Sequence, residues 1–426
     1  MRPRYTTFGA LLAAFVTATS SSGIAAQDLL IRGAKVYTLA QSAPLENADV
    51  LVREGRIVAV GKELAATPGA TIVDARGRPL TPGFFGGLSD IGVDEITAAP
   101  ETVDSQLDLG TVQEPHFRPE FDITLAFNRR SITLAVARIE GLTWTVLAPT
   151  AGGSIVAGQG AGVTLDARKQ PILEPSRSLF IDLGSDTAAL AGGSRAAQFM
   201  LLDQAIRELH TPPSGSERAL LYRAGREALG RYLKGGRLLM HVDRAADISR
   251  AIAFARGNGF QPVIVGGAES WLVADELAAA RVAVILDPLV NLPASFDTLG
   301  ARLDNAALLH RAGVLIAFSM SYGTAVPSAT FEARKVRQLA GNAVAQGLDW
   351  SAALAALTVN PARIFGLDDS RGTLAVGKVA DLVLWSGDPL EVTSAADQVW
   401  IDGRAVEMRS RQTRLRDRYA PGVREQ

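Results

Sequence analysis

The chain has no cysteine among its 426 residues. This absence excludes disulfides, thiolate metal ligands, a cysteine nucleophile and a lipid-modified cysteine. An excess of either charge is also missing, since 43 Lys and Arg stand against 44 Asp and Glu, for a formal net charge of -1. General nucleic-acid and membrane-surface binders need a basic surface, so the composition argues against both classes of partner.

Long hydrophobic runs are missing after residue 26, and nothing there resembles a membrane helix. Before it, Arg2 and Arg4 precede an apolar run over residues 8–16, and small residues follow up to Ala26. A basic start, a short apolar centre and small residues at the end are typical of a secretory signal peptide. The sequence therefore predicts that residues 1–26 are removed and the mature chain exported. Export without disulfides fits a bacterial periplasm.

Short β-rich runs separated by turn residues occupy residues 28–82, and similar runs return at residues 382–385 and 398–401. Runs this short cannot make a good core alone. We therefore expect a small composite β-sandwich domain built from both chain ends, from residues 27–82 and 368–408.

Residues 83–367 alternate apolar strand-like runs with amphipathic helical stretches. Continuous apolar strands separated by helices predict an α/β fold with a parallel sheet covered on its outer face. Closure as a (β/α)8 TIM-type barrel places the chemistry at the C-terminal strand ends. Residues 154–165 supply the eighth strand or form a hairpin insertion. The seven other expected strands are residues 84–91, 143–147, 179–183, 238–242, 262–265, 282–286 and 314–318.

Two further segments lack a clear place in this scheme. Residues 98–120 are largely polar and broken by three prolines, which predicts a long loop over the barrel mouth, as a lid or an oligomer contact. Five arginines between Arg409 and Arg418 make residues 409–426 a basic C-terminal tail. We expect this tail to be solvated or to pack on its own protein rather than to bind a partner.

Three stretches carry a resemblance to a known family. Residues 80–90 read LTPGFFGGLSD, residues 360–367 read NPARIFGL and residues 372–385 read GTLAVGKVADLVLW. They resemble the amidohydrolase superfamily, in particular its imidazolonepropionase-like branch, and the resemblance covers nearly the entire mature chain. It implies a barrel hydrolase that acts on a small-molecule substrate at a carbon–nitrogen bond other than a peptide bond, with one or two metals at the mouth.

The family's metal ligands are mostly replaced in this chain. The family pattern has an HxH pair on the first strand, two further histidines, a carboxylated lysine and an aspartate on the last strand. Leu88 and Asp90 stand at the first pair, residues 264–269 read IVGGAE at the fourth histidine, and Ser319 replaces the aspartate. Only His241 matches a ligand position. A binuclear zinc site is therefore not expected, and an oxygen-rich site for one divalent metal stays open.

The acidic and hydroxyl groups at expected strand ends are the other candidates. We predict His241, Asp90 and Asp287 as catalytic, with His241 as a neutral general base or the remaining metal ligand. Structural alternatives are open, since Asp90 and Asp287 also suit turn caps. Asp182 is a weaker candidate for a functional role at this site. Predicted substrate-binding residues are Glu269, Ser321 and Tyr322.

The other three histidines are not assigned to catalysis. His116 lies in the proline-broken loop, His210 ends a helix before two prolines, and His310 falls on a helix that covers the barrel surface. None of these positions corresponds to the end of a barrel strand. His241 is thus the single histidine expected at the mouth.

Two interpretations of the whole chain remain. The first is an exported hydrolase with a divergent, metal-depleted active site, which the retention of His241 with several carboxylates favours. The second is a catalytically inactive barrel that binds a small molecule or partners an intact amidohydrolase, which the apolar or absent side chains at Leu88 and Gly266 favour. A homo-oligomer is compatible with both.

Overall fold

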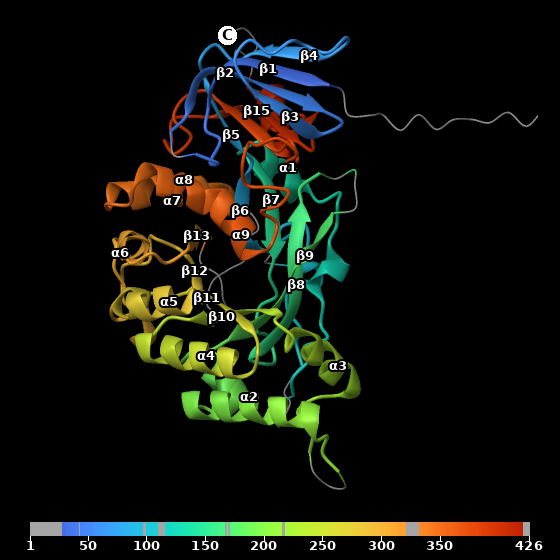
Figure 1. The fold of residues 1–426 in the computed structure, drawn as a ribbon. Coiled ribbons are helices and arrows are strands. Elements are labelled where there is room, and N and C mark those ends of the chain that lie inside the picture. Colours follow the sequence, from blue (N-terminus) through green and yellow to red (C-terminus); the bar gives the residue numbers. More distant parts are fainter. Residues whose placement is uncertain are drawn as a thin grey trace, which may run out of the picture.

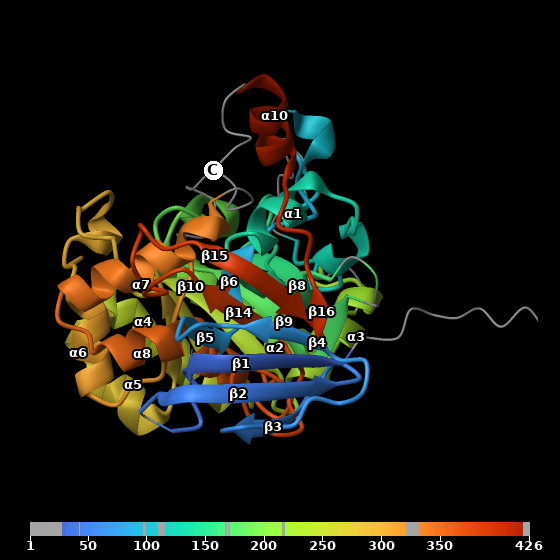
Figure 2. The ribbon, with the colours of Figure 1, turned by 90° about the horizontal axis from the view of Figure 1, so that it is seen from above.

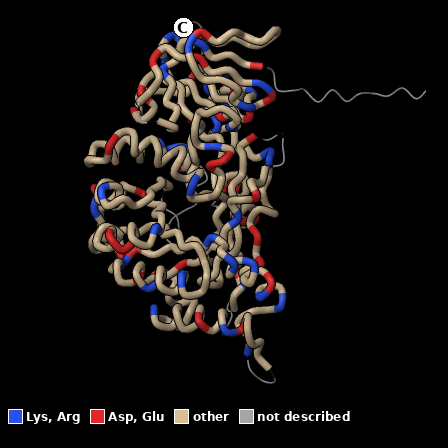
Figure 3. Tube along the Cα trace, in the orientation of Figure 1, with Lys and Arg blue, Asp and Glu red and all other residues tan. Residues whose placement is uncertain are grey.

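The computed structural model describes residues 28–41, 43–96, 99–109, 116–166, 168, 171–214, 218–320 and 332–420. The predicted signal peptide lies outside these residues, as do Ser321 and Tyr322. In the described part of the chain, no helix is both long and apolar enough to cross a membrane. Positions of both charge signs are scattered along the trace (Figure 3).

Strands from both chain ends join in one sheet at one end of the molecule (Figures 1 and 2). The junction is the antiparallel pairing of β14 with β5, where Leu382 faces Pro82 and Leu384 faces Leu80. The order is β16-β15-β14-β5-β1-β2-β3, with β4 paired to β1. The strands are β1 (Leu29–Val36), β2 (Leu45–Arg53), β3 (Arg56–Gly61), β4 (Thr71–Asp74), β5 (Pro79–Pro82), β14 (Leu382–Trp385), β15 (Ala396–Ile401) and β16 (Arg404–Ala405).

Alternating apolar residues hold this sheet together. Ile31, Val50 and Leu80 are fully buried, and Leu382 from the far end of the chain joins the same cluster. The composite origin of the sheet follows from this shared core, because neither set of short strands buries enough apolar surface alone. The second layer that a sandwich requires stays a prediction.

The second sheet forms a TIM-type barrel, nearly closed, in the order β13-β12-β11-β10-β9-β8-β7-β6. All seven apolar runs expected to be strands contribute to it. Its members are β6 (Phe84–Ser89), β7 (Leu142–Leu147), β8 (Val156–Thr164), β9 (Ile172–Asp182), β10 (Arg237–Val242), β11 (Gln261–Gly266), β12 (Ala283–Leu286) and β13 (Ile316–Phe318).

The strict eightfold β/α repeat is corrected at β8. This strand runs antiparallel to both β7 and β9, whereas the other neighbouring pairs are parallel. The reason lies in the connections: residues 148–155 and 165–171 are too short for a parallel crossover, which needs a dozen or more residues. Residues 154–165 therefore do both things expected of them, since β8 completes the sheet and forms a hairpin with β9.

The seam between β13 and β6 is closed by a side chain. No ladder pairing joins these two strands in the part of the chain that the structure describes. Instead the backbone N–H of Leu88 donates to Ser319 Oγ at 2.9 Å. Gly87, at φ +79°, permits this approach, because a Cβ there would lie 2.8 Å from the same oxygen.

Helices cover the outside of the barrel, and α4 to α8 are stacked along the parallel strands (Figure 1). Inside, the rings of Phe85, Trp144 and Phe365 pack together, with the first two centroids 4.6 Å apart. Aromatic side chains thus fill part of the interior. The helices are α1 (Ile132–Arg138), α2 (Arg195–His210), α3 (Arg223–Tyr232), α4 (Ala245–Gly257), α5 (Ala274–Ala280), α6 (Asn305–Arg311), α7 (Val336–Ala345), α8 (Trp350–Leu357), α9 (Val359–Ile364) and α10 (Arg411–Tyr419).

The basic C-terminal segment begins with a helix. Ser410 caps α10 through a capping box with Thr413, and no residue of the helix is buried. The helix lies beside α1 (Figure 2). Arg414 pairs with Glu407 on the chain leading into it. Its arginines thus belong to an exposed helix that touches its own protein.

Candidate functional site

A cavity of about 310 Å³ lies at the C-terminal ends of β10 to β13. Four consecutive strands contribute to its lining: His241 is the penultimate residue of β10, Gly266 ends β11, Asp287 follows β12 and Ser319 follows β13. Parallel strands bring their carboxyl ends to one edge, which is why residues 241 to 319 meet here. We call it the mouth cavity.

His241 is held by a carboxylate from the neighbouring strand. Its register partner on β9 is Asp182, whose side chain is 2% exposed, and His241 Nδ1 lies 3.1 Å from Asp182 Oδ1. This contact orients the ring, so that Nε2 faces β11. A Cβ built on Gly266 would lie 3.2 Å from that Nε2. The glycine therefore leaves room beside the nitrogen that faces the cavity.

The charge on His241 differs from the expectation of a neutral base. Burial by itself lowers the pKa of His241, but the hydrogen bond to Asp182 and the negative charges of Asp182, Asp243 and Asp186 outweigh it and raise the pKa to about 9. The imidazole is thus protonated at neutral pH. In this state both ring nitrogens carry a proton, and Nε2 is a donor toward the cavity.

Three carboxylates line the mouth cavity: Asp186, Asp243 and Asp287. Backbone amides anchor two of them, since Ala268 N donates to Asp243 Oδ1 at 3.0 Å and Leu289 N donates to Asp287 Oδ1 at 2.9 Å. The Oδ2 of Asp243 has no hydrogen-bond partner among the described residues. Asp287 therefore both caps its loop and lines the cavity, which combines the two roles considered for it.

Part of the remaining lining is apolar, part of it is polar but uncharged, and no described lining residue other than His241 carries a cationic side chain. Val265, Ile285, Leu286, Val290 and Met320 form the apolar part of the wall, as far as the described residues define it. Three carboxylates outweigh one imidazolium, so the cavity carries a negative balance. A ligand with a cationic group and a compact apolar body matches such a lining.

Two of the predicted site residues lie elsewhere. Asp90 is 6% exposed after β6, where its carbonyl oxygen accepts the amides of Val93 and Asp94, and it is not among the cavity's lining residues. The carboxylate of Glu269 accepts the amides of Ala245 and Gly300, each at 3.0 Å, and it too is absent from the lining. Both placements suit structural roles. Ser321 and Tyr322 lie outside the described residues.

Three carboxylates around His241 were not among the predicted site residues. Asp182 is a weaker candidate from the sequence, and the signal that points to it is its position at the end of an expected strand. Asp243 is two residues beyond His241, at the same strand end. Asp186 is exposed in the loop after β9, and only the folded chain brings its charge near the imidazole.

The donors at the mouth do not fit the family's binuclear zinc site. Leu88 and Gly266 bring no donor side chain, the hydroxyl of Ser319 accepts the Leu88 amide, and Nδ1 of His241 faces Asp182. Over the described ranges, no group of three or more His, Cys, Asp or Glu side chains is placed to hold a metal ion. No step of the chemistry is therefore assigned to a metal.

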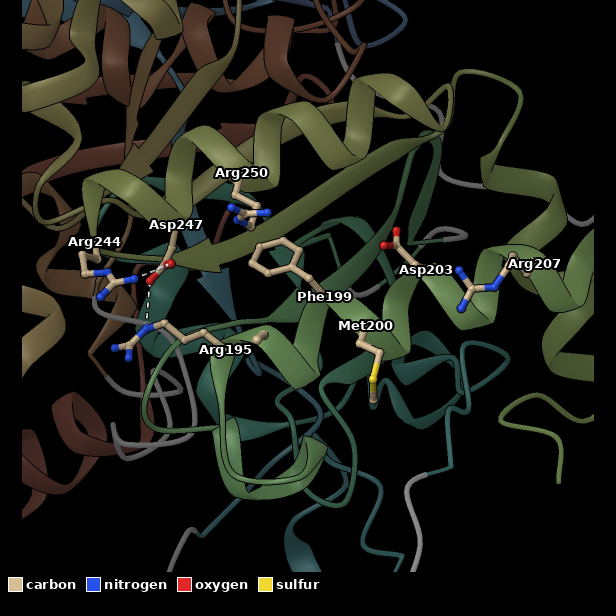
Figure 4. Close-up of a pocket in the computed structure, with 9 residues that line it drawn as sticks. Arg195, Phe199, Met200, Asp203, Arg207, Arg244, Asp247 and Arg250 are labelled. Carbon is tan, nitrogen blue, oxygen red and sulfur yellow. Dashed lines mark hydrogen bonds and ion pairs between the residues drawn. The ribbon is translucent and has the colours of Figure 1, made fainter.

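A larger cavity of about 520 Å³ lies between α2 and α4 (Figure 4). Its Asp247 lies 2.9 Å from Arg195 and 2.8 Å from Arg244, so these charges compensate one another. Arg250 covers the ring of Phe199. No histidine is among the described residues that line it. With its central charges already paired, this cavity is a weaker candidate than the mouth cavity.

Comparison with known proteins agrees with this architecture. A family model described as Amidohydrolase family matches residues 222–407. The adenine deaminase of Deinococcus deserti is 28% identical over 366 residues, which are 85% of this chain and 57% of that protein. The imidazolonepropionase of Symbiobacterium thermophilum is 27% identical over 409 residues, covering 84% of this chain and 91% of that protein.

A solved structure gives the same result. The amidohydrolase from Thermotoga maritima superposes with a TM-score of 0.77 at 27% identity, covering 89% of this chain and all of that one. The chain spans only 57% of the Deinococcus deserti adenine deaminase and 6% of amidohydrolase tasK from Hapsidospora irregularis. The shared barrel, the family match over residues 222–407 and these similarities support the amidohydrolase superfamily.

Proposed function

We propose that the protein is an exported hydrolase that cleaves a non-peptide carbon–nitrogen bond of a cationic small molecule in the mouth cavity. The reaction class follows the relatives, which are an imidazolonepropionase and adenine deaminases. The substrate charge follows the lining, where three carboxylates surround one histidine. The observation that carries the proposal is the His241–Asp182 pair with Nε2 facing the cavity.

The protonated His241 acts as general acid. Water attacks the carbon of the scissile bond and passes one proton to the carboxylate of Asp243, whose Oδ2 has no other hydrogen-bond partner in the described part of the chain. The carbon–nitrogen bond then breaks, and the leaving nitrogen takes the proton of His241 Nε2. Asp182 keeps the imidazole oriented throughout and stabilises its charge until this proton is transferred. General acid–base groups of this kind contribute about 10²- to 10⁴-fold in rate.

The metal-depleted character of the site belongs to the same proposal. The family positions occupied by Leu88, Gly266 and Ser319 supply no metal ligand. The acid and base described above need none. A chelator such as EDTA is therefore expected to leave turnover unchanged, and full loss that zinc restores would overturn this part of the proposal.

The test is turnover of a panel of linear and cyclic amides, each in a cationic and a neutral form. We expect cationic members to be hydrolysed preferentially and His241→Asn to lower kcat at least about 100-fold. His310→Asn is the matched control, because His310 is exposed near the C-terminal end of α6 and is not among the residues that line the mouth cavity. Equal activity of His241→Asn and the parent protein would refute the proposal, and so would a panel with no hydrolysed member.

Export remains supported by sequence alone. The basic, apolar and small-residue succession in residues 1–26 motivates it. Fractionation of bacteria that express the full chain is expected to place the processed protein in the periplasm. A variant without residues 2–26 should stay in the cytoplasm, and equal distribution of the two would refute export.

A further inference from the structure

A second charged cavity, of about 360 Å³, lies at the opposite ends of the same strands. It is lined by the first residues of β10 to β12 and by the C-terminal ends of α4, α5 and α9. Four of its lining residues are arginines: Arg237, Arg256, Arg281 and Arg363. No aspartate or glutamate is among the described residues that line it. We call it the basal cavity.

Arg237 is the innermost of these arginines. Its Nε donates to the carbonyl of Ile364 at 2.6 Å, Nη1 lies 3.3 Å from the carbonyl of Pro175, and the guanidinium sits 5.5 Å from the centre of the Phe365 ring. Burial lowers the pKa of Arg237 to about 10, with only Tyr232 acting against it. This guanidinium is thus desolvated and positioned without a carboxylate.

The other three arginines are exposed and unpaired in the described part of the chain. Arg256 lies in the last turn of α4, Arg281 follows α5 in the left-handed region at φ +53°, and Arg363 lies in the last turn of α9. A cation at a helix C-terminus offsets about half a negative charge. Three helix ends therefore neutralise less than half of the four positive charges.

The cavity between α2 and α4 differs from the basal cavity because two of its arginines have acidic partners. There, Arg195 and Arg244 share Asp247 (Figure 4). Two aspartates lie among four arginines in that cavity, whereas arginines are the only charged side chains among the described residues that line the basal cavity. A concave cluster of uncompensated guanidinium groups raises the local concentration of anions and favours their binding.

We propose that the basal cavity binds a small oxyanion with at least two negative charges, such as a diphosphate or a tricarboxylate. Guanidinium groups bind phosphate and carboxylate oxygens through paired N–H donors, and a polyvalent anion satisfies several of them at once. The volume accommodates a molecule larger than a single phosphate. The site is independent of the hydrolytic centre, since it uses none of the residues of the mouth cavity.

Titration calorimetry of the full chain with pyrophosphate and with citrate, at constant ionic strength, tests this proposal. We expect saturable binding that the double variant Arg256→Gln/Arg281→Gln weakens at least tenfold. The tighter of the two ligands identifies phosphate or carboxylate as the source of the anion. The matched control is Arg130→Gln/Arg223→Gln, which removes the same charge from two exposed positions outside the cavity and should change affinity less than twofold.

Two results would overturn the inference. One is the absence of saturable heat with either anion up to millimolar concentration. The other is an equal loss of affinity in the two double variants, because that result assigns the binding to net charge and not to this cavity. Circular dichroism and thermal unfolding of each variant establish that the comparison is made between folded proteins.

Discussion

At the mouth of the barrel, three carboxylates and one imidazolium line a cavity, whereas at the opposite end four arginines line another that has no described acidic neighbour. Strands β10 to β12 run from one cavity to the other. The formal net charge of -1 conceals this separation, because opposite charges at the two ends cancel in the sum. Local charge, and not composition, therefore indicates what each end binds.

The two cavities also differ in the groups that surround their most buried cation and in the direction in which its pKa is shifted. At the mouth, His241 Nδ1 lies 3.1 Å from Asp182 Oδ1. The nearby carboxylates outweigh the effect of burial and raise the pKa of His241 to about 9. Arg237 at the base has carbonyl oxygens but no carboxylate, and burial lowers its pKa to about 10. The mouth supplies its own counter-charge, as the acid role proposed for His241 requires. The basal cavity has no such carboxylate among its described lining residues, so a bound anion would have to supply the counter-charge.

Removing the counter-charge at the mouth is expected to have the largest effect. Asp182→Asn keeps the shape of the side chain but removes its charge, so burial again dominates and the pKa of His241 falls below about 9. At pH 8 the imidazole loses the proton that the leaving nitrogen needs, and we expect kcat to fall about 100-fold.

The pH profile separates this role from a structural one. In Asp182→Asn the alkaline limb of kcat should move to lower pH, with part of the activity recovered at pH 6. Asp203→Asn on α2 is the control, because it removes one exposed carboxylate outside the mouth cavity (Figure 4). A loss of the same size at every pH would contradict the assigned proton donor.

The same pair makes stability depend on pH. The pKa of His241 is about 9 in the folded chain, against an ordinary value of 6.5, so its contribution to the free energy of unfolding is complete below about pH 6.5 and is lost as the pH rises through 9. The change is on the order of 3 kcal/mol at 1.36 kcal/mol per pKa unit. Urea unfolding at pH 6 and pH 10 measures it, and His241→Gln should remove most of the difference.

Much of the barrel follows from sequence patterns. Apolar runs such as residues 238–242 and 282–286 predict strands because buried parallel strands need no alternation. The antiparallel direction of β8 does not follow from its own residues, since a strand's direction is set by the connections on either side. His241 was predicted because it stands at the end of an expected barrel strand and immediately before a helix, where the resembling family has a histidine ligand.

The partners of the site were harder to predict. Asp182 meets His241 through the register of β9 against β10, across a gap of 59 residues that no local pattern encodes. Glu269 looked equivalent in sequence, yet it bonds to backbone amides of Ala245 and Gly300. The basal arginines come from one strand and three helix ends and share no motif. Such sites depend on tertiary contacts and not on spacing.

A smaller effect is expected from replacing Asp186, the exposed carboxylate of the mouth cavity. Asp186 contributes charge to His241 and lines the cavity, but solvent screens it. Asp186→Asn should raise KM for a cationic substrate about two- to fivefold, consistent with up to about 1 kcal/mol for an exposed charge pair. Neutral analogues should show no change. An equal increase of KM for both would remove the case for cation selection.

The smallest effect is expected when the basal cavity is altered and the hydrolytic reaction at the mouth cavity is measured. If they are separate sites, Arg256→Gln/Arg281→Gln should leave kcat/KM of the hydrolytic reaction within about twofold of the parent, since additivity holds for distant sites without shared partners. Saturating pyrophosphate should likewise leave kcat/KM unchanged in the parent protein. A change that the double variant abolishes would mean that the strands transmit binding from base to mouth. By linkage, a cationic substrate would then alter the affinity for the anion by the same factor.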